Sequence, residues 1–446
     1  MIPRILFTLL VILSLLFGCE SPQDTEKKTM APPETPQKER KELHTYQLLR
    51  EPLDPVLVET SIEALPLWLK SKESLPVLVL LSNDPFLKPI PHKLEKPVIE
   101  LITDSGETSL VTALKPFSPD PLLLPQMALS SALKSHMFSQ IVWVISGDDS
   151  FKEQTVATFG QHLVNYGAIS EAEVQTFNRT AQGFSGQIHG LPFTVVHESS
   201  LPTITEPALL HIDLSYFRPI YKGEIKTPLY ELLYQTLKQL QTADIPTAAV
   251  SISHSNLGGQ LPLATRFLGT TLAKLFSEPS LLAKPLPESW ETRRKALYLE
   301  NFFQKEKVHE LYLQLLANTP QDASANYALY RSFRELNKGT EALKALAEAI
   351  RLEPAYGVEY LTLSSIALEK KRPDQALKML DLAITAFPEN PFIQLQKAEL
   401  LIALEQTDAA MKLLEELQKL PWSKVYYPQL PNYIASLMTT RPATTD

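Results

Sequence analysis

Hydrophobic and polar positions follow two different patterns along this chain, and the change falls near residue 289. Before it, short continuous apolar runs predict buried strands over residues 76–81, 140–146, 193–197, 208–214 and 247–253. Amphipathic stretches between these runs predict helices over residues 58–70, 125–138, 155–166 and 229–241. Because strands alternate with helices, we predict an α/β domain with a mainly parallel sheet over residues 45–288.

From residue 289 the chain is rich in Ala, Leu, Glu and Lys, and three sets of residues recur every 34 positions. The sets are Pro320, Pro354 and Pro388; Ala342, Ala376 and Ala410; and Leu346, Leu380 and Leu414. This period is that of the tetratricopeptide (TPR) repeat, which the segment resembles. The resemblance implies an all-α superhelix of about four units over residues 289–438. The alternative is a generic helical bundle with coincident proline spacing.

The TPR resemblance also assigns roles to single residues. Ala342 and Ala376 stand where the two helices of a unit cross closely, whereas Tyr330 and Ser364 replace the Gly usual on the first helix. The first helices of such repeats line a groove that binds segments of other proteins. The candidates for this partner-binding groove are Tyr327, Tyr330, Tyr360 and Lys397. The alternative is that the tyrosines only complete the packing between repeats.

The N-terminus is an apolar run, residues 5–17, that follows Arg4. At about 1.5 Å per residue this run spans roughly 20 Å, which is shorter than the ~30 Å hydrocarbon core and typical of a signal peptide. It ends in Leu16-Phe17-Gly18-Cys19, which resembles the lipobox of bacterial lipoproteins. That resemblance implies cleavage after residue 18 and lipidation of Cys19. The alternatives are a plain secretory signal or an uncleaved anchor.

Charge and composition narrow the classes of partner. Residues 19–44 are polar and charged, which predicts a disordered tether, and residues 439–446 form a disordered tail. In bacterial lipoproteins, which the N-terminus resembles, Asp after the lipidated Cys favours retention in the inner membrane. The resemblance therefore implies, from Glu20 at this position, the outer membrane facing the periplasm. The whole chain of 446 residues carries a net charge of −8, so we expect no nucleic-acid partner. Its one cysteine excludes an internal disulfide and a Cys-based metal centre.

Polar residues follow three of the predicted strands. They are Ser82-Asn83-Asp84, the stretch from His211 to Ser215, and His254 to Asn256. Because ligands bind at the carboxyl ends of strands in open parallel sheets, these residues are candidates for a site. The two-residue period of a strand places His211, Asp213 and Ser215 on one face. The structural alternative is a hydrogen-bonded His211–Asp213 pair that closes the sheet edge.

This layout resembles the arginase and deacetylase superfamily, whose fold is a three-layer α/β sandwich. Asp213, Tyr216 and Phe217 match its D-x-D-Y-F motif, but Ser215 replaces the second Asp. The other motif, D-x-H-x-D, is largely missing around Asp84. The resemblance implies that Asp84, Asp213 and His254 could still bind Zn²⁺ or Mn²⁺, with His211, Ser215 and Asn256 as ligand candidates at the sheet edge. Because most of the family's ligands are absent, we expect no cofactor and a non-catalytic domain.

Three hypotheses for function follow. The first is a lipid-anchored envelope protein whose repeats bind a protein or peptide partner, while Cys19 attaches it to the membrane. The second is a metal-dependent hydrolase of an amide or amidine. The third is a structural lipoprotein whose α/β domain caps the first repeat through an apolar seam of Trp290, Phe302 and Phe303.

Overall fold

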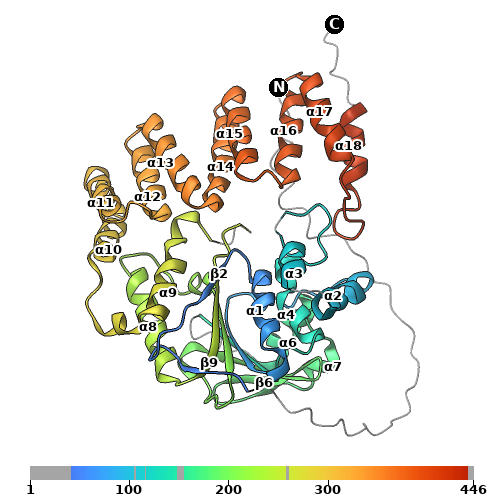
Figure 1. Ribbon diagram of the computed structural model, residues 1–446, viewed down its shortest axis with the longest axis vertical. Coiled ribbons are helices and arrows are strands. Elements are labelled where there is room, and N and C mark those ends of the chain that lie inside the picture. Colours follow the sequence, from blue (N-terminus) through green and yellow to red (C-terminus); the bar gives the residue numbers. More distant parts are fainter. Residues whose placement is uncertain (1–41, 105–106, 116, 148–154, 258–260, 440–446) are drawn as a thin grey trace. The chain divides into compact units, whose positions relative to one another are not determined.

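The computed structural model describes residues 42–104, 107–115, 117–147, 155–257 and 261–439 (Figure 1). These residues belong to one compact unit. The predicted signal peptide, Cys19, most of the tether and nearly all of the tail lie outside the described residues. No helix within the described ranges is long and apolar enough to cross a bilayer.

The first part of the chain folds around a mainly parallel sheet. Its strands are β1 (Tyr46–Gln47), β2 (Val56–Val58), β3 (Val77–Leu81), β4 (Gln140–Ile145), β5 (Asn178–Arg179), β6 (Gly183–Ile188), β7 (Leu191–His197), β8 (Ala208–Asp213) and β9 (Pro246–Ser253). Their order is β1-β9-β8-β3-β4-β7-β6-β5, and β2 also pairs with β9. Strands β2, β9, β8, β3, β4 and β7 pair in parallel, whereas the pairs β1–β9, β5–β6 and β6–β7 are antiparallel. The prediction of a mainly parallel α/β sheet is confirmed.

Helices cover both faces of this sheet. Leu78 and Leu80 of β3 pack in one core, whereas Val77, Val79 and Leu81 pack in the other. The first core is covered by α1 (Leu65–Lys70), α2 (His92–Asp104), α3 (Glu107–Ala113), α4 (Ala128–Lys134) and α6 (Val156–Asn165), and the second by α8 (Leu229–Thr242) and α9 (Phe267–Ser277). Because both faces are buried, β3 is apolar throughout rather than alternating.

The five predicted strands are present, but the sequence missed other elements. Residues 178–188 form the hairpin strands β5 and β6; β5 has only two residues, both polar, and the glycines Gly183 and Gly186 hide β6 from a pattern search. A Cβ at Gly183 would lie 2.0 Å from the Val195 carbonyl oxygen, so only glycine fits there. The predicted helix over residues 58–70 is divided into the end of β2, the 3-10 helix η2 (Ser61–Ala64) and α1.

The second part of the chain is helical from Glu288 onward (Figure 1). Its helices are α10 (Glu288–Glu300), α11 (Lys305–Asn318), α12 (Ala323–Glu335), α13 (Gly339–Leu352), α14 (Glu359–Glu369), α15 (Pro373–Ala386), α16 (Pro391–Ala403), α17 (Thr407–Gln418) and α18 (Leu430–Thr439). The first eight form four successive antiparallel pairs. Ala342, Ala376 and Ala410 are fully buried, as the 34-residue period predicts for close helix crossings.

Candidate functional site

The carboxyl ends of β8 and β9 bring together a buried cluster of polar side chains. Asp213 lies at its centre, and its Oδ2 accepts hydrogen bonds from the hydroxyls of Ser61, Ser253 and Ser255. Its Oδ1 accepts the Ser215 backbone N–H at 2.9 Å. The carboxylate has no exposed surface, and its two oxygens accept four hydrogen bonds. These donors compensate the cost of burying the charge.

His211 belongs to the same cluster and lies on the same face of β8 as Asp213. Its Nδ1 lies 2.8 Å from the Ser251 hydroxyl and its Nε2 lies 3.0 Å from the Ser61 hydroxyl. Trp68 packs edge-on against the ring at 5.4 Å. Burial lowers the pKa of His211 below its ordinary value, although Asp213 acts in the opposite direction. The shared strand face was predicted, but serine hydroxyls, rather than a direct contact, link the two side chains.

Ser215 is not a strand residue. Strand β8 ends at Asp213, and residues 214–217 form the 3-10 helix η6 (Leu214–Phe217), so Ser215 no longer follows the two-residue period. Its hydroxyl is buried and has no hydrogen-bond partner among the described residues. The prediction that Ser215 would lie on the same strand face as His211 and Asp213 is therefore wrong.

Asp84 lies in the loop after β3, and local contacts occupy its carboxylate. Its Oδ1 accepts the Phe86 backbone N–H at 2.7 Å, and Tyr166 donates its hydroxyl at 3.2–3.3 Å. Burial raises the pKa of Asp84 above its ordinary value. Tyr166 directly follows α6, so the pair joins the loop after β3 to the end of this helix.

His254 follows β9 and is enclosed by its neighbours. Its Nδ1 is buried without a hydrogen-bond partner in the described part of the chain, and its ring fills the space beside Gly269. Burial and the nearby Arg266 lower the pKa of His254 to about 4, so the ring is neutral at physiological pH.

The structure does not assemble the metal site that the sequence allowed. Within the described ranges, no three His, Cys, Asp or Glu side chains form a group that could hold a metal ion. Asp213 is bonded to hydroxyls, Asp84 to Phe86 and Tyr166, and His254 is packed against Gly269. The combination of Asp84, Asp213 and His254 is therefore wrong as a ligand set in this structure.

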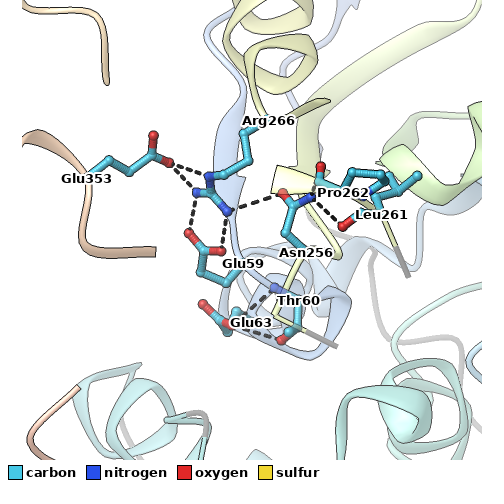
Figure 2. Close-up of polar contacts among 8 residues, drawn as sticks. All are labelled: Glu59, Thr60, Glu63, Asn256, Leu261, Pro262, Arg266 and Glu353. Atoms are coloured by element: carbon cyan, nitrogen blue, oxygen red, sulfur yellow. Dashed lines mark hydrogen bonds and ion pairs between the residues drawn. The ribbon is translucent and has the colours of Figure 1, made fainter. Parts of the chain in front are cut away.

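Arg266 is the charged residue that connects this sheet edge to the repeats (Figure 2). Its guanidinium is 1% exposed and binds Glu59, at the end of β2, through Nη1 and Nη2 at 2.8 and 2.7 Å. Nε donates to Glu353, at the end of α13, at 2.9 Å, and Nη1 to Asn256 at 3.3 Å. Arg266 also lies over the ring of Tyr356, 5.6 Å from its centroid. One buried cation thus joins three segments that are distant in sequence.

Asn256 has a structural role in the same contact. Its Nδ2 donates to the carbonyl oxygens of Leu261 and Pro262 at 3.1 and 3.0 Å, while its Oδ1 accepts from Arg266 (Figure 2). The donors and the acceptor of this amide are therefore all in use. The prediction that Asn256 is available to a ligand at the sheet edge is not supported by this arrangement.

The tyrosines expected in the groove are buried between helices. The hydroxyls of Tyr327 and Tyr330 donate to Glu359 at 2.8 and 2.7 Å, and Tyr327 stacks on Tyr356 at 4.7 Å. Tyr360 is 5% exposed. These three rings complete the packing between repeats, so their prediction as an open groove surface is wrong. Lys397 is partly exposed and forms an ion pair with Asp381.

The α/β part packs against the repeats at several points. Trp290 stacks on Tyr230 at 5.8 Å, and Leu263, in the 3-10 helix η7 (Leu263–Thr265), belongs to the same core as α12. Near the C-terminus the Tyr426 hydroxyl donates to the Leu122 carbonyl oxygen at 3.1 Å. Trp290 therefore lies in a seam, as expected. Phe302 and Phe303 do not, because they are 46% and 83% exposed.

These contacts determine which residues on the first helix of each repeat remain exposed to solvent. On α12, residues 323–330 are all buried, partly by η7, and on α16 Glu399 accepts a hydrogen bond from Tyr433 of α18 at 2.7 Å. On α14, Thr362, Ser365 and Glu369 are exposed and share one helix face. On α10, the first helix of the first pair, Lys295 and Tyr298 are also exposed, so the open first-helix surface includes parts of α10 and α14.

Sequence reasoning did not single out Arg266, Glu353 or Arg293. No motif surrounds these residues, and the acidic and basic groups that pair with them lie 29 to 207 positions away. The only available signal was Arg266 itself, a lone cation between the apolar residues of 261–268.

Comparison with known proteins supports the prediction of TPR repeats in the helical part of the chain. Residues 367–420 match the family model described as a tetratricopeptide repeat. The solved structure of a thermophilic TPR protein from Thermus thermophilus is 19% identical in sequence to this chain. The alignment covers 40% of this chain and 96% of that chain, with a TM-score of 0.22. MamA is 13% identical, covering 35% and 92% with a TM-score of 0.21. No curated protein matches the chain. The C-terminal part therefore contains TPR repeats, which imply protein partners in general.

Proposed function

We propose that this protein is a lipid-anchored scaffold of the bacterial cell envelope whose repeats bind a protein partner. The observation that supports this best is the match of residues 367–420 to the TPR family, together with four stacked helix pairs. Anchoring through Cys19, an outer-membrane location and exposure to the periplasm are the parts of the proposal that rest on the sequence alone.

The partner surface that we propose is the exposed face of α14, with Thr362, Ser365 and Glu369. These three residues are exposed, whereas residues 323–330 of α12 are buried and Glu399 of α16 is bonded to Tyr433 of α18. The α/β domain serves in this proposal as a non-catalytic support, because neighbouring side chains and backbone groups already bind the polar atoms of Asp84, Asp213 and Asn256. No contact in the described residues favours the hydrolase alternative.

A photocrosslinking amino acid in place of Ser365 tests the partner surface. We expect a discrete adduct with one envelope protein, which Glu369→Arg in the same chain weakens. The matched control carries the crosslinker at Lys378, which is exposed on α15, a second helix of a repeat. Equal adducts from both positions, or an adduct from Lys378 alone, would show that the α14 face is not the partner surface.

Metabolic labelling with a palmitate analogue tests the anchor. We expect the wild-type protein to take up the label and to sediment with membranes. Cys19→Ser removes the only cysteine, so the label should be lost. An unlabelled wild-type chain would overturn lipidation and leave the partner surface to its own test.

A further inference from the structure

A cavity of about 650 Å³ lies where α9 meets the repeats, beside the Arg266–Glu353 pair and apart from the α14 face. Its wall comes from α8 and α9, from the start of α10, and from the turns that end α11 and α13. The side chains that matter here are Tyr230, Phe267, Trp290, Arg293, Asp322 and Tyr356. This volume is within the range of small-molecule sites, roughly 300–1,000 Å³.

Aromatic rings form one wall of this cavity. Tyr230 stacks on Trp290 with 5.8 Å between centroids and 26° between planes, and Phe267 lies 5.8 Å from Tyr230. Trp290 is partly exposed and lines the cavity. The wall therefore offers an apolar surface.

Arg293 supplies a cation with unused donors. Its side chain is 6% exposed and lies over Phe267, 4.7 Å from the ring centroid. Only Nη2 is bonded, to Asp322 at 3.0 Å and to Ser324 at 2.7 Å. The other two nitrogens, Nε and Nη1, make no hydrogen bond to any described residue. Neither is among the fully enclosed unpartnered atoms, so both are accessible. These nitrogens can therefore donate to an acceptor that enters the cavity.

The remaining charges around the cavity are neutralised by each other. Arg266 is bonded to Glu353 and Glu59, and Lys274 pairs with Glu278. Asp322 is the only carboxylate bonded to Arg293, and its other oxygen accepts the backbone N–H groups of Ser324 and Ala325 at the start of α12. The Tyr356 hydroxyl in the same wall has no partner within the described ranges. The unused groups near Arg293 are therefore mostly donors, which favours an acceptor with one negative charge.

We propose that this cavity binds a carboxylate carried on an aromatic or apolar body. One carboxylate oxygen accepts a hydrogen bond from Nη1 of Arg293, and the body packs against Trp290. Because Nη2 already binds Asp322 and Ser324, the contact is a single charge-assisted hydrogen bond rather than a bidentate pair. Two sources carry this chemistry, a free aromatic acid and the carboxyl terminus of a polypeptide. The site does not depend on the α14 partner surface.

Isothermal titration calorimetry on the purified full-length protein tests the proposal. The probes are phenylacetate for the free acid and N-acetyl-Ala-Ala-Phe for the chain terminus, each compared with its neutral amide. We expect one probe to bind with one-to-one stoichiometry and its amide to bind about tenfold more weakly or worse, since a charge-assisted hydrogen bond is lost. The probe that binds more tightly identifies the source.

Two variants locate the binding. Arg293→Gln should weaken the acid about tenfold or more, whereas Arg294→Gln, on the neighbouring residue that pairs with Glu291, should leave its affinity unchanged. If Arg293→Gln does not fold, Thr270→Trp fills the cavity from its exposed rim and should abolish binding. Equal affinity for acid and amide, no binding of either acid at millimolar concentration, or full affinity in a folded Arg293→Gln or Thr270→Trp protein would overturn the proposal.

Discussion

Arg266 is the residue through which the sheet edge and the repeats share a buried charge. It is almost completely enclosed, whereas its partners Glu59 and Glu353 keep about a third of their side-chain surface exposed. Removing the cation would leave the carboxylates of Glu59 and Glu353 close together and partly desolvated, so they would repel each other. Water can reach them, which limits the cost.

Arg266→Gln is therefore expected to lower the free energy of unfolding by about 2–4 kcal/mol, somewhat below the ~3–5 kcal/mol for breaking a fully buried pair. Urea unfolding followed by circular dichroism measures the change. Arg351→Gln is the control, because Arg351 pairs with Glu348 on the surface of α13, and no measurable change is expected. A variant as stable as the wild type would show that Arg266 contributes no net stability.

His254 makes stability depend on pH. Its pKa is about 4 in the folded chain and near 6.5 when unfolded, so the unfolded state binds more protons between these values. The contribution of neutral His254 to the free energy of unfolding is therefore complete above pH 6.5 and is lost as the pH falls towards 4. At about 1.4 kcal/mol for each pKa unit, His254 accounts for a loss of roughly 3 kcal/mol.

His254→Gln isolates this contribution because the carboxyl groups titrate equally in both proteins. The free energy of unfolding at pH 7 and pH 4 is the measurement. The wild type should lose about 3 kcal/mol more than the variant over this range. If both lose the same amount, His254 is not held neutral by burial.

At the scale of elements, helix α12 shows how one side chain combines two functions. Asp322 caps the helix, because Oδ1 accepts the N–H groups of Ser324 and Ala325 at 2.8 and 3.2 Å. Its other oxygen pairs with Arg293. Asp322→Ala removes both contacts, whereas Asp322→Asn keeps an oxygen for the cap.

The Asn variant is therefore expected to be more stable than the Ala variant by about 1 kcal/mol, the usual contribution of an N-cap. Thermal unfolding of the two variants beside the wild type measures it. Identical stabilities would mean that the cap contributes nothing and that pairing with Arg293 explains the whole effect.

Elements with a strong period were predicted well, and irregular ones were not. The 34-residue repeat located α12 to α17, because each repeat buries the same positions against its neighbour. Strand β6 was missed, since Gly183 and Gly186 replace the expected apolar residues where backbone or ring atoms approach closely, and β5 has only two residues, both polar. Ser215 was misplaced for a related reason: no residue pattern marks Asp213 as the end of its strand.

At the scale of the whole molecule, the two parts of the chain contact each other near both ends of the repeat array. Trp290 packs on Tyr230 near α10, and Tyr426 bonds to Leu122 after α17. Arg266 lies between these places in the array, because it binds the end of α13. Such distributed contacts couple the unfolding of the two parts.

Calorimetry of the full-length protein is therefore expected to show one unfolding transition. The double variant Trp290→Ala and Tyr426→Ala should divide it into two, because each part then unfolds with less dependence on the other. Phe303→Ala is the control, since this side chain is 83% exposed and should leave the single transition unchanged. Two transitions in the wild type would contradict the coupling.

The sequence by itself determined what is local or periodic. Continuous apolar runs predicted the buried strands of a mainly parallel sheet, and the 34-residue period predicted the paired helices, because both depend on which residues a regular element buries. The sequence also carries the signal-like N-terminus and Cys19, whose modification stays a prediction.

Only the tertiary structure decided which side chains of different elements contact, pair with or bury one another. It enclosed Asp213 and His211 among serine hydroxyls, buried Tyr327, Tyr330 and Tyr360 between helices, and joined Arg266 to Glu59 and Glu353. It also left Arg293 with unused donors beside an aromatic wall. The physical reason is that charge pairing, desolvation and cavity shape arise from residues far apart in the chain, whose approach no local pattern records.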